Sequence, residues 1–317
     1  MGRGSAGERP DEEIMAPIER IARFMETLDS QFLNDAFAST EVVLIENFSP
    51  YVFEGGDGQA GGASMAADID EPLEPYAHDQ PEYAQAFGTF LTHTDQKTKT
   101  IGLLTDFVNG LRSHGLFVDA GAGEGSTTAT LAKLFDRTIA IEPNSALRAE
   151  LARRCPEAEI VEAPIGEARI ASPADFVLCA HVLYYIPQKD WTDTLERLTS
   201  WLGAYGAAVV LLGNSNADVI ALPREFFGRS IDLAPAVQEF KARHDDFEIV
   251  THTLNCEVVV DDLESACTLT RFFLSDYPDW GRTITRRNVE EYVRSHFTDP
   301  RGYRLSCNQD ALSLVRR

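Results

Sequence analysis

Two acidic residues that flank a glycine-rich segment carry the clearest chemistry in this sequence. Asp119 follows the apolar run 116–118 and precedes Ala-Gly-Ala-Gly-Glu-Gly at 120–125, and Glu142 ends a second apolar run, 138–141. Glycine lets a backbone turn tightly and approach a ligand closely, and the N-terminus of the following helix offers free N–H groups. A carboxylate after the second strand accepts hydrogen bonds from both hydroxyls of a ribose. This pattern indicates a nucleoside-binding βαβ unit.

The spacing of the glycines separates two kinds of nucleoside ligand. A dinucleotide site has glycine at the first, third and sixth positions of the loop. Counted from Gly121, the sixth position is Ser126. Asp119 would repel a pyrophosphate and attract a cation. A nicotinamide enzyme is therefore the alternative, and a cationic nucleoside cofactor is favoured.

The segment Asp-x-Gly-x-Gly-x-Gly that starts at Asp119 resembles motif I of the class I S-adenosylmethionine-dependent methyltransferases. The resemblance implies that the cofactor is S-adenosyl-L-methionine, with its amino-acid end on Asp119 and the loop and its ribose on Glu142. The other residues that it places at the cofactor are Gly121, Gly123, Pro143, Ala163 (against the adenine), Ala180 and His181.

The elements that would position these residues alternate between strand and helix. We expect strands at 116–120, 138–142, 158–161, 175–180 and 207–212 with helices between them, and two late strands at 247–260 and 311–315. Alternation of this kind implies parallel pairing and ligands at the carboxyl ends of the strands. The predicted fold is α/β: a doubly wound, seven-stranded, Rossmann-like methyltransferase sheet with a small α+β N-terminal extension.

The N-terminal part of the chain differs from the rest. We expect residues 1–12 to be disordered, 13–78 to form an extension with one amphipathic helix and two strands, and 79–317 to form the methyltransferase domain. The helix and the segment 42–58 resemble the opening third of nuclear-transport-factor-2-like (SnoaL-like) domains. A truncated relic, a docking arm and chance all explain that resemblance, which implies no catalytic residues.

The composition of the sequence limits the classes of partner that we expect the protein to bind. The 317 residues carry a net charge of -22, which argues against nucleic acid and anionic membranes. No apolar stretch is long enough to span a bilayer, and the polar start lacks a signal-peptide core. The five scattered cysteines indicate reduced thiols in a cytoplasmic protein with no metal site. The oligomeric state is not indicated.

The fourth expected strand and its sequel, 174–187, resemble the motif IV region of small-molecule methyltransferases. His181 lies there, either as a hydrogen-bonded residue that steadies the loop or as a catalytic base near neutral pH. Tyr184 and Tyr185 follow, either as packing residues or as walls of an acceptor pocket.

A second resemblance covers about 83–317. Tyr83, Phe87, Phe90-Leu91 and His93-Thr94 have the spacing of the substrate-binding opening segment of the histamine N-methyltransferase family. The resemblance implies that this segment contacts substrate, although its aromatic residues at i, i+4 and i+7 also suit the buried face of a helix. Three polar positions depart from the family, which has glutamate at Gln96, glutamine at His181 and asparagine at Asp310. Histamine itself is therefore not expected.

These patterns predict methyl transfer from S-adenosylmethionine to a small-molecule acceptor. N-methylation of an amine is favoured, with His181 as the catalytic residue. The expected acceptor contacts also include Asp310, for which a solvated strand-end carboxylate is the alternative. O-methylation of a phenol or carboxylate and a non-catalytic cofactor-binding module are the other readings.

Overall fold

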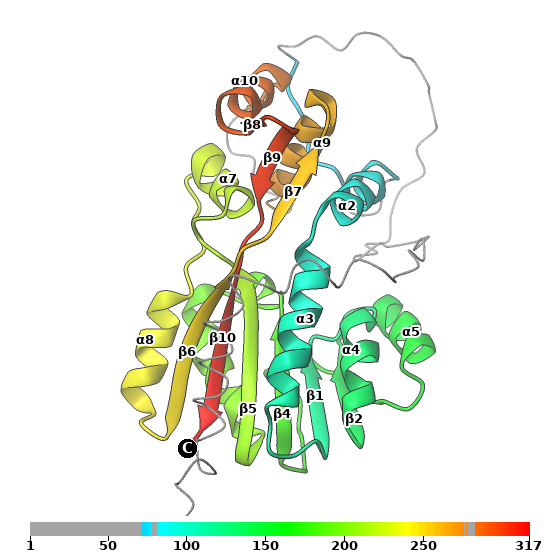
Figure 1. Ribbon diagram of the computed structural model, residues 1–317, viewed down its shortest axis with the longest axis vertical. Helices are drawn as coiled ribbons and strands as arrows, with labels where there is room; N and C mark the ends of the chain where they lie inside the picture. The colour runs from blue at the N-terminus through cyan, green and yellow to red at the C-terminus, as the bar shows by residue number, and fades with distance from the viewer. Residues whose placement is uncertain (1–70, 78–80, 276, 278–282) are drawn as a thin grey trace, which may run out of the picture.

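A seven-stranded sheet forms the centre of the lower lobe in Figure 1, with the strand order β3-β2-β1-β4-β5-β10-β6. Strands β1 to β5 pair in parallel, whereas β10 is antiparallel to both β5 and β6. The predicted doubly wound sheet is thus confirmed. The computed structural model describes residues 71–77, 81–275, 277 and 283–317; the expected disordered start, N-terminal helix and strand pair lie outside them. The strand bounds are Leu116–Ala120 (β1), Arg137–Ile141 (β2), Glu159–Val161 (β3), Ala174–Ala180 (β4), Leu202–Gly213 (β5), Phe247–Leu254 (β6) and Gln309–Arg316 (β10).

Helices cover both faces of this sheet because successive side chains of each central strand point to opposite faces. Phe117 of β1 packs in the cluster under α3 and α4, whereas its neighbour Val118 packs in the cluster that holds α6 and α8. Both faces of the sheet are covered by apolar packing, so every residue of β1 is buried. The helices are Gln96–Asn109 (α3), Ser126–Leu131 (α4) and Ser145–Arg154 (α5) on one face, and Trp191–Ser200 (α6) and Ala234–Arg243 (α8) on the other.

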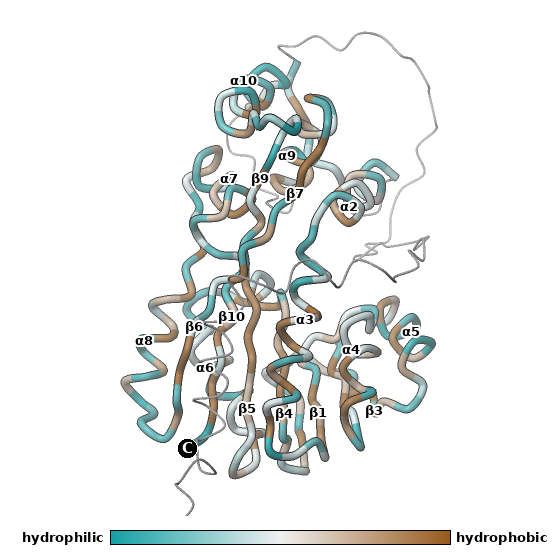
Figure 2. The backbone as a smooth tube through the Cα atoms, viewed as in Figure 1, coloured by the Kyte–Doolittle hydropathy of each residue, from teal (hydrophilic) through white to brown (hydrophobic). Residues whose placement is uncertain are grey.

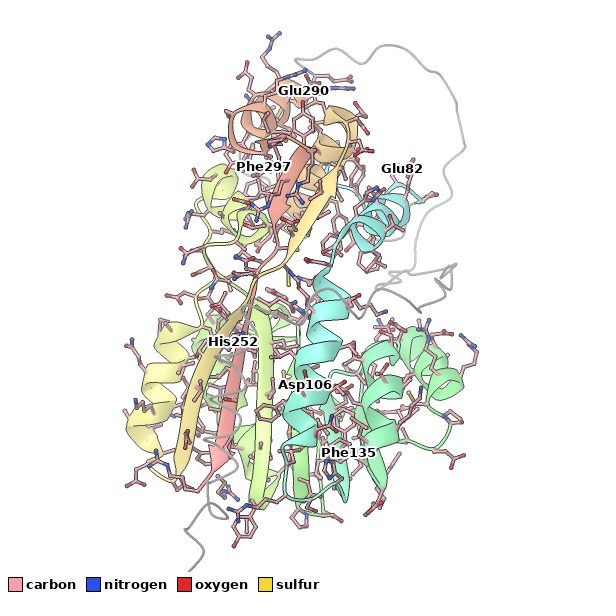
Figure 3. All side chains as sticks on the ribbon, in the orientation of Figure 1. Glu82, Asp106, Phe135, His252, Glu290 and Phe297 are labelled. Atoms are coloured by element: carbon pink, nitrogen blue, oxygen red, sulfur yellow. The ribbon has the colours of Figure 1, made fainter. Side chains whose placement is uncertain are left out.

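A second lobe, which we call the cap, lies above the carboxyl ends of the strands (Figure 1). It combines the three-stranded sheet β7-β9-β8 with four helices. Its buried residues form a cluster of their own, apart from the clusters of the lower lobe. Hydrophobic segments occur in both lobes (Figure 2). The labelled Phe297 belongs to the cap cluster, whereas Phe135 packs on the cluster that holds α3 and α4 (Figure 3). The cap elements are Pro81–His93 (α2), Asp218–Phe227 (α7), Glu257–Val260 (β7), Leu263–Ser275 (α9), Arg286–His296 (α10), Thr298–Asp299 (β8) and Gly302–Ser306 (β9).

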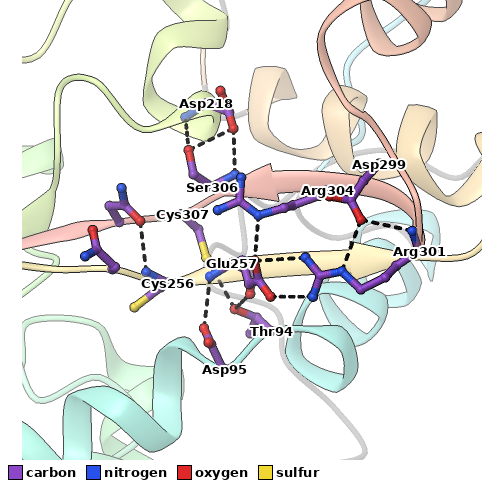
Figure 4. A network of polar contacts seen from close by, with 12 residues as sticks. Thr94, Asp95, Asp218, Cys256, Glu257, Asp299, Arg301, Arg304, Ser306 and Cys307 are labelled. Carbon is purple, nitrogen blue, oxygen red and sulfur yellow. Dashed lines mark hydrogen bonds and ion pairs between the residues drawn. The ribbon is translucent and has the colours of Figure 1, made fainter. Parts of the chain in front are cut away.

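The prediction of a single strand at 247–260 is wrong. This segment contains two strands, β6 and β7, which belong to different sheets. The break lies at Cys256, whose backbone N–H donates to the side-chain Oδ1 of Asn308 at 2.9 Å (Figure 4). The chain passes from the cap sheet to the lower sheet again between β9 and β10. This second change of sheet lies beside the first, since the N–H of Cys307, between β9 and β10, donates to the Cys256 carbonyl at 2.9 Å.

Charged and polar side chains brace this junction between the lobes (Figure 4). The N–H of Glu257 donates to Asp95 at the start of α3 (2.9 Å), and the Glu257 carboxylate accepts from Arg301 (2.8 Å) and Arg304 (2.5 Å). The cap is therefore tied to α3 as well as to the two strands. No helix in the part of the chain that the structure describes is both long and apolar enough to cross a bilayer.

Candidate active site

The glycine loop follows β1 and bends with three positive φ angles, at Gly121 (87°), Gly123 (56°) and Gly125 (85°). Residues with a Cβ rarely adopt such angles. A Cβ on Gly121 would lie 2.3 Å from Val182 Cγ2, so the loop also needs glycine for close packing against the segment after β4. A Cβ on Gly123 would meet nothing within 4 Å, which leaves this side of the loop open to a ligand.

Asp119 is buried at the end of β1, with 3% of its surface exposed. Its Oδ2 accepts a hydrogen bond from Thr128 Oγ1 at 2.6 Å. Burial raises the pKa of Asp119 to about 7; the Thr128 hydrogen bond opposes this shift, and repulsion from Glu142 adds to it. A cationic ligand would restore the charged form of this carboxyl.

Glu142 links the loop to the end of β2. One carboxylate oxygen accepts from the Gly123 N–H (2.9 Å) and the other from the Asn144 N–H (2.8 Å). Two carboxylate oxygens offer about four acceptor positions, so these two bonds orient Glu142 and leave acceptor capacity for ribose hydroxyls. The remaining predicted cofactor positions flank these elements: Pro143 is exposed and accepts from Arg148 (2.5 Å), Ala163 follows β3, and Ala180 ends β4.

His181 follows Ala180 and has a φ of 58°, which makes it the one residue other than glycine with a positive φ in the described part of the chain. Its N–H donates to Leu211 O at 2.9 Å, and its Nε2 pairs with Gln309 Oε1 at 2.7 Å. Burial lowers the pKa of His181, and the Gln309 bond opposes this shift. The imidazole is therefore neutral near pH 7, and a strained backbone held from two sides is typical of functional positions.

A pocket of about 900 Å³ lies between the glycine loop and the cap. Its floor includes Ser126 at the start of α4 together with His181, and its walls come largely from cap and loop aromatics. The structure brings six of the seven predicted acceptor-site residues together here, namely Tyr83, Phe87, Gln96, His181, Tyr184 and Tyr185.

Two of the aromatic positions show how the pocket is built. Tyr83 and Phe87 pack on Phe272 of α9, with ring centroids 5.0 and 5.8 Å away. They are thus part of the cap core and of the pocket wall at once, and the contact of this segment with an acceptor stays a prediction. Tyr185 is 67% exposed, which places it at the pocket mouth.

Asp310 is the predicted acceptor residue that the structure does not bring to the pocket. Its Oδ1 accepts from Asn214 Nδ2 (2.9 Å) and Thr253 Oγ1 (2.7 Å), so it ties the ends of β5 and β6 to β10. Its neighbour Gln309 is fully buried and contacts His181 instead. The sequence signal for Gln309 was its place next to Asp310, because strand neighbours point to opposite faces.

Comparison with known proteins agrees with this geometry. Residues 117–206 match a protein family described as a methyltransferase domain. No curated protein matches the chain. Two solved structures share the fold with a TM-score of 0.51 and cover 68% of this chain and 97% of their own: YcgJ from Bacillus subtilis, at 13% identity, and a putative methyltransferase from Bacillus halodurans C-125, at 10%. The N-methyltransferase NodS from Bradyrhizobium japonicum WM9 aligns at 12% identity with a TM-score of 0.41, over 75% of this chain and 89% of its own.

The sheet order, the glycine loop and the family match define the class. The chain is an S-adenosylmethionine-dependent methyltransferase, and S-adenosylmethionine is its cofactor. The residues present fit that molecule: a buried acid for its cationic end, an open glycine for close approach, and a carboxylate at the second strand for its ribose. When bound, the cofactor supplies an electrophilic methyl group on a sulfonium.

The raised pKa of Asp119, about 7, predicts that cofactor affinity depends on pH. The protein must lose the Asp119 proton to pair with the cofactor's positive charge, so affinity should rise with pH until Asp119 is ionised. We expect the Kd for S-adenosylmethionine to fall about tenfold or more from pH 5.5 to 7.5. Calorimetry at both pH values tests this, with Asp119→Asn as the variant that should bind weakly and without pH dependence. An equal Kd at both pH values for the unmodified protein would contradict it.

Proposed function

We propose that the protein transfers the methyl group of S-adenosylmethionine to a small molecule held in the cap pocket, and that the favoured reaction is N-methylation of an amine. One observation carries the proposal: one pocket is lined by Glu124 of the glycine loop, by His181 and by the aromatic side chains of the cap. A volume of about 900 Å³ falls in the range of small-molecule sites. The covering cap and the net charge of -22 disfavour a nucleic-acid acceptor.

The charges of the pocket bear on the form in which the acceptor binds. Among the described residues that line it, the charged ones are Lys97, Glu124 and Arg229. Glu124 pairs with Arg154 at 2.6 Å, so its charge is balanced. We therefore expect an aromatic or apolar acceptor that binds as a neutral amine rather than as an ammonium ion.

S-adenosylmethionine, held by Asp119, the glycine loop and Glu142, would supply its sulfonium methyl group for direct displacement by the acceptor nitrogen. The new C–N bond would replace the C–S bond, whose electrons would stay on sulfur. The acceptor nitrogen gains a positive charge and gives its proton to His181. The protein contributes mainly alignment and exclusion of water, effects worth several kcal/mol. A phenol would release its proton to the same base, which makes O-methylation the alternative.

Replacing His181 with asparagine tests the base. Asparagine tolerates a positive φ, so the backbone should be kept while the proton acceptor is lost. We expect kcat to fall by about a hundredfold, within the usual range for a general base. His296→Asn, on the exposed face of α10, is the matched control. A kcat within threefold of the unmodified enzyme would remove His181 from the chemistry.

The acceptor is found by a transfer screen with S-adenosylmethionine labelled in its methyl group, against small amines, amino acids, phenols and carboxylates. The proposal expects label in an amine product. Label in phenols alone would establish the O-methylation alternative. Calorimetric cofactor binding without transfer to any acceptor would favour a non-catalytic binding module.

A further inference from the structure

A chain of side-chain hydrogen bonds runs from α3 to the pocket, and its direction follows from the donors at its two ends. At one end, the Thr100 hydroxyl donates to the Gln96 carbonyl at 2.7 Å. Its single hydrogen is then used, so Thr100 Oγ1 must accept the contact of 2.8 Å from Gln309 Nε2. The amide nitrogen of Gln309 therefore faces Thr100, and its Oε1 faces His181.

This direction assigns the tautomer of His181. Gln309 Oε1 only accepts hydrogen bonds, and it lies 2.7 Å from His181 Nε2. Nε2 must therefore carry the proton, which leaves the lone pair of the neutral ring on Nδ1. At the other end of this series of hydrogen bonds, the Gly213 N–H donates to the Tyr184 hydroxyl at 2.6 Å, and this hydroxyl lies beside His181 Nδ1. That last contact is 3.5 Å long, the outer limit of a hydrogen bond, and it holds the Nδ1 lone pair only weakly.

We propose that Gln309 is a positioning residue that holds His181 as the Nε2–H tautomer, so that Nδ1, beside the Tyr184 hydroxyl, is the atom that accepts the acceptor's proton during methyl transfer. The proposal rests on the proposed function, because it names how that site moves its proton. Gln309 comes from β10, 128 residues away in the chain, and is fully buried. A buried amide with both ends paired is costly to rearrange, so it fixes one orientation of the ring.

The uncharged amide has a chemical advantage over a carboxylate at this position. A carboxylate next to His181 would stabilise the imidazolium and keep the base protonated at neutral pH. An amide oxygen orients the ring and supports the transient imidazolium without a full charge. After transfer, the proton lies on Nδ1 and the positive charge is shared over the ring, with Nε2–H still donating to Gln309.

Two variants change the partner of Nε2 while leaving the pocket walls in place. Gln309→Glu should raise the pH at which kcat/KM reaches half its maximum by one unit or more, and lower activity at pH 7 about tenfold. Gln309→Leu should lower kcat about tenfold or more, through lost orientation, with the KM for S-adenosylmethionine unchanged. Gln238→Leu, on the exposed surface of α8, is the matched control and should change neither.

A measurement that needs no acceptor separates this proposal from the proposed function. Nitrogen-15 NMR of the histidine rings should show His181 in the unmodified protein as the neutral Nε2–H form at pH 7, with Gln309→Glu raising its pKa. Thr100→Val removes the hydroxyl that accepts from Gln309 Nε2, and it replaces the Gln309 variants if they fail to fold. It should increase the fraction of His181 in the Nδ1–H form.

An Nδ1–H tautomer of His181 in the unmodified protein overturns the proposal, even if methyl transfer is observed. A pH dependence of kcat/KM that neither Gln309→Glu nor Thr100→Val changes overturns it as well. The expected tautomer with no transfer to any acceptor overturns the proposed function, and with it the proton-accepting role, while the positioning of the ring by Gln309 stands.

Discussion

Replacing Glu142 with alanine is expected to weaken S-adenosylmethionine binding by about a hundredfold. The change removes the carboxylate that would accept the ribose hydroxyls, and charge-assisted hydrogen bonds contribute about 1.5–3 kcal/mol each. It also leaves the N–H groups of Gly123 and Asn144 without their acceptor, which loosens the loop against the end of β2. Isothermal titration calorimetry with S-adenosylmethionine measures the loss directly.

The matched control is Glu264→Ala, in the cap. Its carboxylate pairs with Arg286 and its side chain is 69% exposed, so the change removes one acidic charge far from the loop. Cofactor affinity should stay within twofold of the unmodified protein. If Glu142→Ala also stays within twofold, the assignment of Glu142 to the ribose is wrong.

Gly121→Ala adds only one methyl group but is expected to lower the stability of the fold strongly. A new Cβ would lie 2.3 Å from Val182 Cγ2, and the residue would have to keep a φ of 87°. Left-handed strain and overpacking each cost about 1–3 kcal/mol, so the free energy of unfolding should fall by about 2–5 kcal/mol. Chemical denaturation, followed by circular dichroism, measures it.

Two further variants separate the cost of backbone strain from the cost of steric overlap with Val182. Gly123→Ala has a φ of 56° and no atom within 4 Å of the new Cβ, so it carries the strain alone and should cost about 1 kcal/mol. The double variant Gly121→Ala/Val182→Ala removes the colliding methyl and should recover part of the loss, offset by the loss of Val182 packing. Equal effects of Gly121→Ala and Gly123→Ala would show that the contact with Val182 does not constrain the loop.

Much of the lower lobe was predictable because its signals are local. Apolar runs ending on Asp119 and Glu142, and glycines between them, define strand, turn and helix from neighbouring residues alone. The cap was not predictable in this way. Between Phe247 and Val260 the sequence reads as one strand, and the transfer from one sheet to the other depends on Asn308, which lies far along the chain. A pattern with a period of two identifies a strand but not its sheet.

The site shows the same limit at the level of single residues. The family resemblance pointed to the positions of Gln96 and His181, and the structure places both in the pocket. It also pointed to Asp310, whereas the residue that reaches His181 is Gln309. A shift of one residue in a strand moves a side chain to the other face. The sequence could therefore indicate the strand end, but only the register of β10 against β5 and β6 assigns the side chain.

We expect the cofactor's methyl group to face the pocket that contains His181. A crystal structure of the protein with S-adenosylhomocysteine tests it most directly. We expect the ribose hydroxyls on Glu142 and the amino-acid end beside Asp119 and the glycine loop. The sulfur should be open toward the ring of His181 and the aromatic walls of the cap. A sulfur directed away from this pocket, or a ribose bound elsewhere than Glu142, would contradict it.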